Sequence, residues 1–476
     1  MTPAYIAFHA GGRPDAVAIV NDGREITYAD FWRDIRKFTA GLRDFGLPRG
    51  AKVLIDCDDV YNHWLLRFAF ERLGVITATT SPRQDSASLS FLRNFDLVLS
   101  ERDFRAEGAR RRHRMTAQWL QEIFASGDED DAPALVAHSE DPLRILQTSG
   151  TTGTPKGVLY SRRIHDRAIE KVMWFVGFTH RSRYLQALPL GVGGPTACMR
   201  AGGIVIMERR MTTAEAITAH AITHTTLPPI ALKQVLDELP ESFVKPAELT
   251  ILSLGARLSG ALRDKAISRL ASDVCDLYGS NEAGFVSSTR GTAEVGTVWP
   301  GVEVEIVDEE DRPLPYGALG RIRVRTDCMV ERYLDDPDTT ARAFRDGWFY
   351  AGDLGTLQQA GRLRVFGRSD DVLNIGWNKF SPEMLEDLVL KSASVGDVGV
   401  CAIANADGVD EIAVAVSDPR SSPQELLELI TRAFGNFQVG NFNVLRVERI
   451  PRNANGKIER DRLKDVVAIS MRTKEA

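Results

Sequence analysis

The sequence predicts an α/β fold with a large N-terminal domain, residues 1–369, and a small α+β C-terminal domain, residues 370–476. A chain of 476 residues exceeds the size of one ordinary hydrophobic core, so several units are expected. Short apolar runs alternate with helical patterns over residues 15–100 and 143–290, which is typical of parallel sheets flanked by helices. Residues 295–368 are strand-rich and interrupted by proline and glycine, which predicts a β-rich subdomain.

The first elements can be read directly from the pattern. Residues 16–20 form an apolar run that predicts a strand, and Asn21-Asp22-Gly23 predicts a turn. Thr27 is a suitable N-cap for a helix whose apolar residues, from Phe31 to Leu42, recur at helical spacing. Residues 53–55 predict the next strand. A second helix should then contain Trp64, Phe68 and Phe70.

Residues 102–131 interrupt this alternation. Residues 110–114 are basic and residues 128–131 are acidic, so we expect a solvated connection. The alternative is a functional patch, in which the arginines meet the phosphates of a bulky thiol substrate. Near the C-terminus, helices are expected at 382–391 and 423–434, with strands near 397–404 and 411–417.

Composition excludes several classes of protein. The net charge of -6 and the pI of about 5.9 argue against a nucleic-acid binder. The sequence has neither an apolar run long enough to span a membrane nor a signal peptide at its start. The five cysteines are far apart, so we expect buried free thiols in a reducing, cytoplasmic compartment, without zinc or disulfides. His224 lies in an apolar stretch and is expected to be a core residue.

The most informative motif follows the apolar strand predicted at residues 143–146. It combines hydroxyls, glycines and a lysine, and its candidate anion-binding residues are Thr148, Ser149, Gly150, Thr151, Thr152, Gly153 and Lys156. Glycines allow a tight turn, backbone N–H groups and hydroxyls can surround an anion, and the lysine adds positive charge. The motif differs from the Walker pattern, because Gly157 follows the lysine and the chain continues as a strand. The loop therefore predicts a phosphate site, with a polar surface hairpin as the alternative.

Two further motifs lie at or near predicted strands. Tyr278-Gly279-Ser280-Asn281-Glu282 follows the run 274–277, and ligands of open α/β sheets bind at the carboxyl ends of strands. There an aromatic ring can stack on a base, an amide can hold a phosphate, and a carboxylate can hold Mg²⁺. Asp353 follows a tight turn, where one carboxylate can accept both hydroxyls of a ribose. Each motif alone could be an ordinary turn.

The last motif, Asn455-Gly456-Lys457, places a lysine on a glycine turn from which it can reach across a cleft between domains. Without the other motifs, an ordinary exposed lysine would be the better interpretation. In this order and at these separations, the motifs closely resemble those of the adenylate-forming superfamily. That family includes acyl- and aryl-CoA synthetases, adenylation domains of peptide synthetases, and firefly luciferase. The resemblance extends from Ile26 to Leu463, nearly the whole chain.

The resemblance implies a role for each motif. The 148–157 loop would hold the β- and γ-phosphates of ATP, and the segment containing Gly255 and Ala256 would line the adenine and acyl pockets. Tyr278 would stack on adenine, with Gly279 beside it. Glu282 would be the magnesium ligand. Asn281 stands where relatives have threonine, and its amide can still donate to the α-phosphate.

The remaining implied roles belong to the second half of the chain. Asp353 and Arg368 would bind the ribose. Asp370 would be the hinge about which a mobile C-terminal domain rotates. Lys457 would bridge the carboxylate and the α-phosphate during adenylation.

The acid pocket departs from the family pattern. Many relatives have an aromatic residue and a histidine after Pro189-Leu190, whereas this chain has a short glycine-rich segment. We assign Gly191, Val192 and Gly193, together with Gly279 and Gly284, to the acid pocket. The segment 187–201 contains no aspartate to pair with an α-ammonium group, which disfavours an amino-acid substrate. The pocket wall should be recessed, or formed by residues such as Trp174 or Phe285.

The resemblance implies an AMP-forming acid–thiol ligase that uses ATP and Mg²⁺. An aryl or medium aliphatic acid would become an acyl-AMP, and the acyl group would then pass to coenzyme A as a thioester. The alternative acceptor is the phosphopantetheine thiol of a separate carrier protein. A third hypothesis is an adenylate-binding protein without ligase activity, but the retention of Lys156, Glu282, Asp353, Arg368 and Lys457 argues against it.

Overall fold

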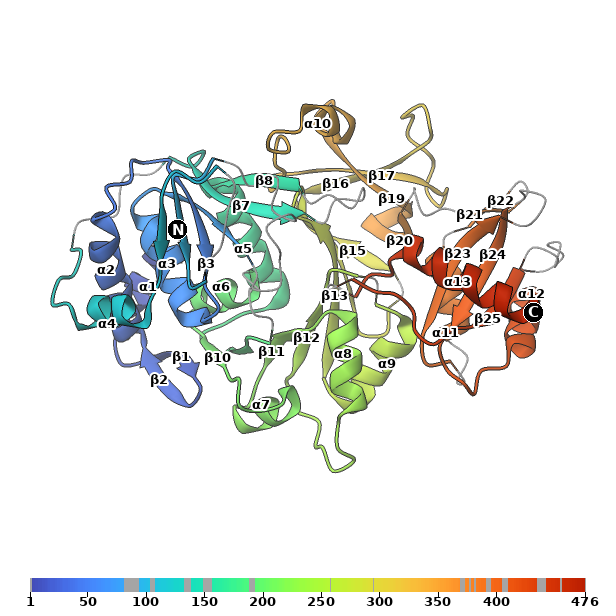
Figure 1. Cartoon of the computed structure of the whole chain (residues 1–476), viewed down its shortest axis with the longest axis horizontal. Coiled ribbons are helices and arrows are strands. Elements are labelled where there is room, and N and C mark those ends of the chain that lie inside the picture. The colour runs from blue at the N-terminus through green and yellow to red at the C-terminus, as the bar shows by residue number, and fades with distance from the viewer. Residues whose placement is uncertain are drawn as a thin grey trace.

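In the computed structural model, the chain forms two large sheets with helices around them, and a smaller C-terminal unit (Figure 1). It describes residues 2–80, 94–102, 108–131, 138–148, 156–187, 193–256, 258–293, 295–368, 373–375, 378–380, 382–390, 395–404, 410–434, 442–453 and 456–475. The predicted α/β architecture, with parallel sheets flanked by helices, is confirmed.

The first large sheet has six strands in the order β6-β5-β3-β4-β7-β8. These strands are β3 (Lys52–Asp56), β4 (Ile76–Thr79), β5 (Leu97–Ser100), β6 (Arg112–Arg114), β7 (Pro142–Thr148) and β8 (Lys156–Ser161). Its neighbouring strands are parallel except β7 and β8, which pair antiparallel. The strands predicted at residues 53–55 and 143–146 are therefore confirmed.

The second sheet contains fourteen of the described strands, thirteen of them in the order β16-β17-β19-β20-β15-β14-β13-β12-β11-β9-β10-β1-β2, with β18 paired to β19. The bounds are β1 (Val17–Asn21), β2 (Arg24–Thr27), β9 (Arg183–Leu185), β10 (Ile204–Met207), β11 (His224–Thr226), β12 (Thr250–Ser253), β13 (Asp273–Ser280), β14 (Gly284–Arg290), β15 (Gly296–Val298), β16 (Val302–Val307), β17 (Gly320–Thr326), β18 (Phe344–Arg345), β19 (Trp348–Gln358) and β20 (Arg362–Arg368). Pairing is parallel along β1-β10-β9-β11-β12-β13, and it is antiparallel between β1 and β2 and from β13 outward to β16. The predicted β-rich subdomain thus continues this sheet, because the β13–β14 hairpin reverses the chain where the parallel part of the sheet ends.

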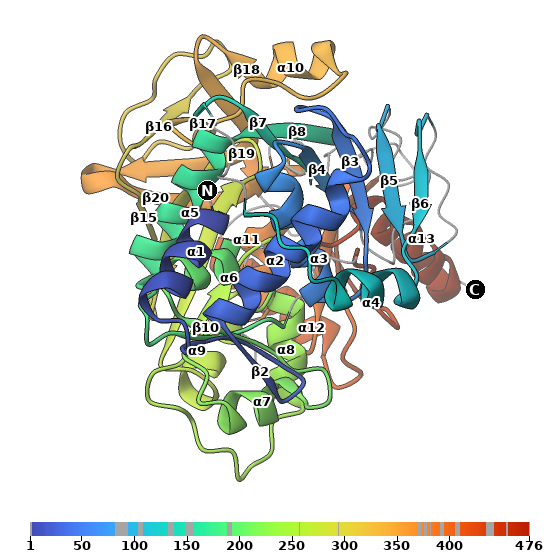
Figure 2. The same cartoon turned by 90° about the vertical axis from the view of Figure 1, so that its left-hand side faces the viewer.

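The described helices cover the faces of these sheets. They are α1 (Thr2–Gly12), α2 (Tyr28–Arg43), α3 (Val60–Arg72), α4 (Ala117–Ala125), α5 (Arg162–Val176), α6 (Gly193–Arg200), α7 (Thr213–Ala219), α8 (Pro229–Asp237), α9 (Gly260–Arg269) and α10 (Pro337–Ala343). Figure 2 shows α1 to α4 gathered at the N-terminal end of the molecule. Thr27 and Asp30 form a capping box at the start of α2, as expected for an N-cap threonine. The residues from Phe31 to Leu42 at helical spacing are buried, which confirms the predicted apolar face.

The expectation of a merely solvated connection over residues 102–131 is wrong. The segment contains β6 and α4, although the arginines at 110–112 and 114 are exposed as expected. Helix α4 forms because its apolar side chains find a partner surface on α2. Ile123 lies against Gly41, and the ring of Phe124 packs on that of Phe38 with 5.2 Å between the ring centroids.

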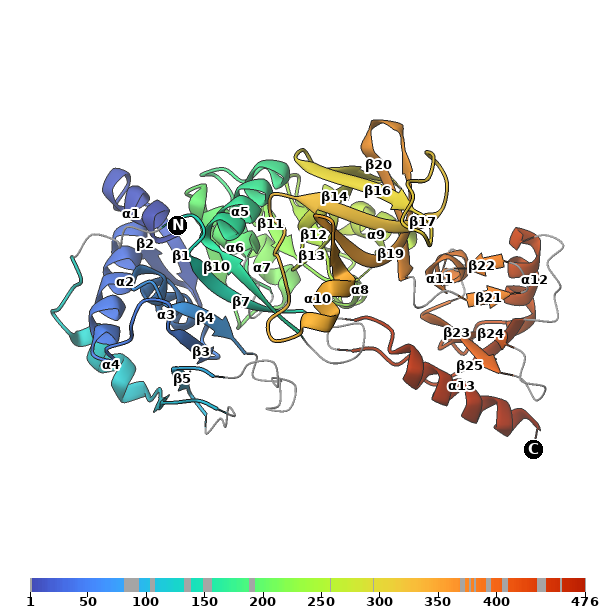
Figure 3. The same cartoon turned by 90° about the horizontal axis from the view of Figure 1, so that it is seen from above.

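The C-terminal residues form their own hydrophobic clusters around a three-stranded sheet. Its strands are β23 (Val398–Ala404), β24 (Asp410–Val416) and β25 (Phe442–Arg446), preceded by the hairpin β21 (Leu373–Ile375) and β22 (Asn378–Phe380) and accompanied by α11 (Pro382–Leu390), α12 (Pro423–Phe434) and α13 (Arg460–Glu475). The helices and strands predicted here are confirmed. Seen from above, α11, α12 and this sheet lie at the end of the molecule opposite α1 and α2 (Figure 3). The proposed boundary at 369/370 lies outside the described residues.

The cysteines and His224 lie in the interior. All five cysteines are buried free thiols, and His224 is buried, as predicted. Burial lowers the pKa of His224 to about 4, so the side chain is neutral in the core. None of the helices in the described part of the chain is long and apolar enough to cross a membrane.

Candidate active site

The candidate site lies where the carboxyl ends of strands from the two large sheets meet. Strand β7 ends at Thr148, and β13 ends at Ser280. The amide of Asn281, directly after β13, donates a hydrogen bond to the Gln147 carbonyl oxygen at 2.8 Å. Two motifs that are far apart in sequence are thus joined at one edge. Thr148 is buried there, and the predicted loop residues from Ser149 to Gly153 lie outside the described residues.

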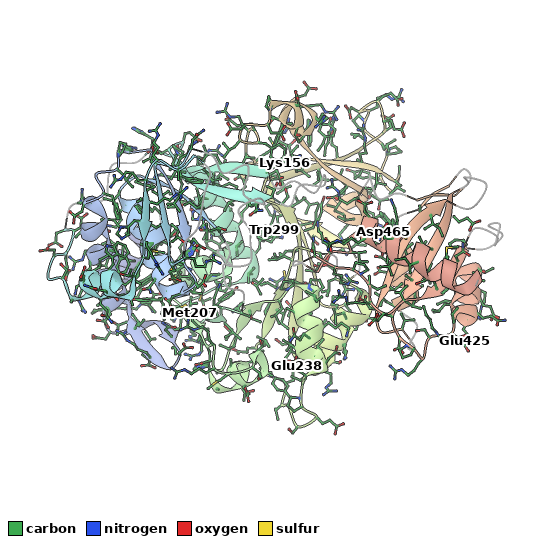
Figure 4. All side chains as sticks on the ribbon, in the orientation of Figure 1. Lys156, Met207, Glu238, Trp299, Glu425 and Asp465 are labelled. Atoms are coloured by element: carbon green, nitrogen blue, oxygen red, sulfur yellow. The ribbon has the colours of Figure 1, made fainter. Side chains whose placement is uncertain are left out.

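Lys156 begins β8, on the far side of that loop. Its Nζ lies over the ring of Tyr333, 5.2 Å from the ring centroid, which is a cation–π geometry. Figure 4 shows Lys156 between the N-terminal and C-terminal ends of the molecule. The backbone holds this pair in place, because Val158 forms a β-bridge with Tyr333 and the Leu334 N–H donates to the Gly157 carbonyl oxygen at 2.8 Å.

Tyr333 also contacts the predicted magnesium ligand. Its hydroxyl donates to Oε1 of Glu282 at 2.9 Å. Glu282 is buried, and its Oε2 accepts no hydrogen bond from the residues that the structure describes. Burial and the neighbouring Glu282 carboxylate raise the pKa of Tyr333, so its hydroxyl remains a proton donor. Sequence reasoning missed Tyr333, because no spacing pattern connects it to either Lys156 or Glu282.

A second cluster forms around Asp353, on β19. The Tyr278 hydroxyl donates to Oδ2 of Asp353 at 2.7 Å, and Arg368 forms an ion pair with Oδ1 at 3.3 Å. Asp353 and Arg368 are direct partners in the β19–β20 ladder, so the sheet itself sets this pair. Burial raises the pKa of Asp353, whereas the charges of Arg368 and Lys457 and the Tyr278 hydrogen bond act in the opposite direction. The predicted ribose pair and the predicted stacking tyrosine therefore lie in contact.

Lys457 lies in the C-terminal unit. Its side chain is exposed, yet close enough to Asp353 to act on its pKa. The turn before it is held by the Lys457 N–H, which donates to Oδ1 of Asn453 at 3.0 Å. Gly456 has a positive φ of 79° and packs against Ile230 of α8, where an added Cβ would lie 2.9 Å from Cγ2 of Ile230. A side chain at 456 would therefore push the lysine turn away from α8.

The predicted glycines have definite steric roles. A Cβ at Gly279 would lie 2.7 Å from the Cα of Phe285 and closer still to the Gly284 carbonyl oxygen. Gly284 has a φ of 69°, and a Cβ there would lie 3.0 Å from the Cβ of Cys328. Gly255 has a φ of 89° and, with Ala256, follows β12 beside β13. Gly279 and Gly284 thus let the β13–β14 hairpin close tightly, with Tyr278 before the turn and Glu282 in it.

The acid-pocket residues are only partly placed. Gly191 and Val192, like the proposed hinge Asp370, lie outside the described residues. Gly193 begins α6, and a Cβ there would meet nothing within 4 Å, whereas one at Gly194 would lie 2.6 Å from the ring of Tyr184. The suggestion that Trp174 lines the pocket is wrong, because its side chain points into solvent and is 76% exposed. Phe285 instead packs on Trp299, whose place near the middle of the molecule Figure 4 shows.

Comparison with known proteins agrees with this geometry. Residues 6–334 match the family model described as AMP-binding enzyme. The chain belongs to this family. Among curated AMP-binding relatives, a salicylyl-CoA synthase / salicylate adenylyltransferase from Streptomyces sp is 27% identical, covering 95% of this chain and 91% of the relative. The fatty acid–[acyl-carrier-protein] ligase ScoC from Streptomyces coeruleorubidus is 25% identical, covering 96% of this chain and 95% of ScoC.

Solved structures show the same fold. The crystal structure of ATP-bound MatB from Rhodopseudomonas palustris superimposes with a TM-score of 0.86 at 21% sequence identity, covering 98% of this chain and 99% of MatB. The protein is therefore an adenylate-forming enzyme of the AMP-binding family, in which both CoA ligases and carrier-protein ligases occur.

Proposed function

We propose that this protein activates an aryl or medium aliphatic carboxylic acid with ATP and transfers the acyl group to coenzyme A. The observation that carries the proposal is the contact of Tyr278 and Arg368 with the Asp353 carboxylate, whose pKa the Lys457 charge also lowers. A carboxylate flanked by an aromatic ring and two cations suits a ribose beside a stacked base and a phosphate group.

The first step joins two anions. The substrate carboxylate attacks the α-phosphate of ATP, the bond to the β-phosphate oxygen breaks, and pyrophosphate leaves with the electron pair. Lys457 would neutralise the carboxylate and the α-phosphate as they approach, and Lys156 would hold the leaving phosphates. A thiol then attacks the acyl carbon, loses its proton and displaces AMP. Because the two steps need different surroundings, we propose Asp370 as the hinge that moves Lys457 away between them.

Glu282 is the residue proposed to hold Mg²⁺. No group of three or more candidate metal ligands occurs in the described part of the chain, which suits an ion that keeps several waters and is shared with phosphates. The available Oε2 of Glu282 and the Tyr333 hydrogen bond to Oε1 fit a single oriented carboxylate ligand. When bound, the ion would neutralise phosphate charge.

Tyr333→Phe should weaken magnesium activation while keeping the fold. The variant retains the ring under Lys156 and loses the hydrogen bond that orients Glu282. We expect the Mg²⁺ concentration that gives half-maximal pyrophosphate exchange to rise roughly tenfold. Tyr316→Phe is the matched control, because that tyrosine is 66% exposed. An unchanged magnesium titration for Tyr333→Phe would refute the positioning role.

A second candidate for the acceptor of the acyl group is the phosphopantetheine thiol of a carrier protein. The similarity to the fatty acid–[acyl-carrier-protein] ligase ScoC favours this alternative, whereas the similarity to a salicylyl-CoA synthase favours coenzyme A. In this alternative the carrier is a separate partner protein.

One experiment tests both steps in order. Pyrophosphate exchange is measured over aryl and aliphatic acids of increasing length, and the best acid is then offered with CoA alone or with a holo acyl carrier protein alone. Exchange followed by thioester formation with CoA is the expected result. A thioester only on the carrier would select the alternative, and normal ATP binding without exchange over the whole panel would overturn ligase activity.

Gly193→Leu should shift the acid preference toward smaller acids without changing ATP affinity. Among the described residues, no atom lies within 4 Å of a Cβ added at Gly193, so the backbone there accepts a side chain. We expect kcat/KM to fall at least tenfold for the largest accepted acid and to change little for the smallest. Gly12→Leu is the matched control, since a Cβ at Gly12 also meets nothing within 4 Å and α1 is not part of the proposed pocket. An equal fall for every acid would refute a specificity role for this position.

A further inference from the structure

An unusual group of charged side chains is buried between α3, α5 and β7. It consists of Arg67, Arg144, Arg162 and Glu71, here called the arginine cluster, and each member is 3–5% exposed. His63, Arg67 and Glu71 follow one another at four-residue spacing along α3, so they share one face of that helix. The cluster is separate from the residues assigned to adenylation.

The arginines have mostly neutral partners. Arg67 donates to the Thr196 hydroxyl at 3.3 Å, Arg144 donates to the Thr79 hydroxyl at 3.2 Å, and Arg162 donates to the Glu71 carbonyl oxygen at 3.1 Å. The sole carboxylate of the cluster, Glu71, comes no closer than 4.0 Å to Arg162. Three guanidinium groups therefore face one loosely placed carboxylate.

Several buried donors remain unused within the described chain. They are Nη1 of Arg67, Nε and Nη1 of Arg144, and Nε and Nη1 of Arg162. A buried donor without a partner is destabilising, and a buried charge without a counter-charge is more so. Within the described chain, Oε1 of Glu71 also lacks a hydrogen-bond partner, but the five unused donors outnumber this one acceptor, so a further acceptor is needed to satisfy them.

The neighbouring histidines do not supply it. Burial and the adjacent arginines lower the pKa of His63 to about 3 and that of His165 to about 4, so both rings are neutral at pH 7. Asp166 already forms an ion pair with a fourth buried arginine, Arg200. The positive charge of the cluster therefore exceeds the negative charge around it.

We propose that the arginine cluster binds a small inorganic monoanion of the halide class. The enclosed donors favour a small ion, and guanidinium groups lose weakly held water when they bind it. A surface pocket of about 270 Å³ lies beside Arg162, and its charged lining residues are Arg162, Arg163, Arg167, Asp166 and Glu170. Strand β7 leads into the 148–157 loop, and α6 carries Thr196. The ion would therefore link two elements that lie next to the active site.

Bromide substitution tests the proposal on the unmodified protein. Crystals of the full chain are grown in sodium bromide, and diffraction is measured at the bromine absorption edge. We expect an anomalous peak within about 3.5 Å of guanidinium nitrogens of Arg67, Arg144 or Arg162. Peaks at other places with none in the cluster would overturn the proposal.

Thermal unfolding gives an independent test in solution. At constant ionic strength, replacing gluconate by chloride should raise Tm by on the order of 2 °C for each tenfold increase above the dissociation constant. The chloride dependence should vanish in Arg67→Met and persist in Arg33→Met, whose arginine forms an exposed pair with Asp30. If Arg67→Met does not fold, Arg162→Lys, which removes two unused donors, takes its place. A chloride dependence that survives in the cluster variant that folds would assign the effect to another site and refute the proposal.

Discussion

Lys457→Ala is expected to lower acyl-AMP formation at least a hundredfold and to leave thioester formation from supplied acyl-AMP nearly unchanged. The Lys457 ammonium lies close enough to Asp353 to act on its pKa, so its charge is available where the α-phosphate would be placed. Loss of one positioned charge that acts only while two anions meet raises that barrier by roughly 3 kcal/mol. Pyrophosphate exchange measures the first step, and thioester release from synthetic acyl-AMP measures the second.

The matched control for this variant is Lys464→Ala. Lys464 lies on α13 of the same C-terminal unit and forms an exposed i,i+3 pair with Asp461. It should retain both activities, because a surface pair of this kind contributes little. An exchange rate in Lys457→Ala equal to that of the control would remove Lys457 from the adenylation step.

Gly279→Ala should abolish nucleotide binding with a modest loss of stability. The added methyl group would overlap the Gly284 carbonyl oxygen and approach the Cα of Phe285, both backbone atoms that cannot rotate away. The β13–β14 hairpin must therefore open, which displaces Tyr278 before it and Glu282 after it. A displacement of about 1 Å at a reacting geometry lowers rates roughly a hundredfold. ATP affinity by calorimetry and exchange by radiolabelled pyrophosphate measure the two losses.

Gly260→Ala controls for the general effect of an added methyl group. At Gly260, the first residue of α9, a new Cβ would meet only Arg263 at an ordinary 3.8 Å. Stability there should be unchanged or slightly higher, since alanine restricts the unfolded chain. If Gly279→Ala binds ATP as tightly as this control, the hairpin does not position the nucleotide site.

Elements controlled by local pattern were predicted from the sequence. The cap at Thr27 and the buried face of α2 follow from adjacent residues, so one sequence contains the whole signal. The motif at 278–282 was placed at a strand end, and β13 continues through Ser280. The contact between Tyr278 and Asp353, which are 75 residues apart, was not predicted, because the family resemblance gave only a separate role for each residue.

Features formed by contacts between residues far apart in sequence were not predicted. Helix α4 looked like a polar linker, since its partner surface belongs to α2. Tyr333 has no periodic relation to Lys156 or Glu282, and a β-bridge to Val158 brings it there. The arginine cluster has one signal in the sequence. His63, Arg67 and Glu71 recur at four-residue spacing on a helix whose other buried residues are mostly apolar. That spacing indicates a buried polar face, but the facing Arg144 and Arg162 come from other elements.

The contact between Gly456 and Ile230 bears on how this enzyme could be tuned. A glycine and an isoleucine that is 44% exposed bury little apolar surface between them, and at about 25 cal/mol per Å² such a contact is worth on the order of 1 kcal/mol. Substitutions at 230 would therefore change how long Gly456 and the adjoining Lys457 stay against α8, without altering any of the residues proposed to bind ATP. Larger or more polar residues there offer a way to vary turnover separately from substrate affinity.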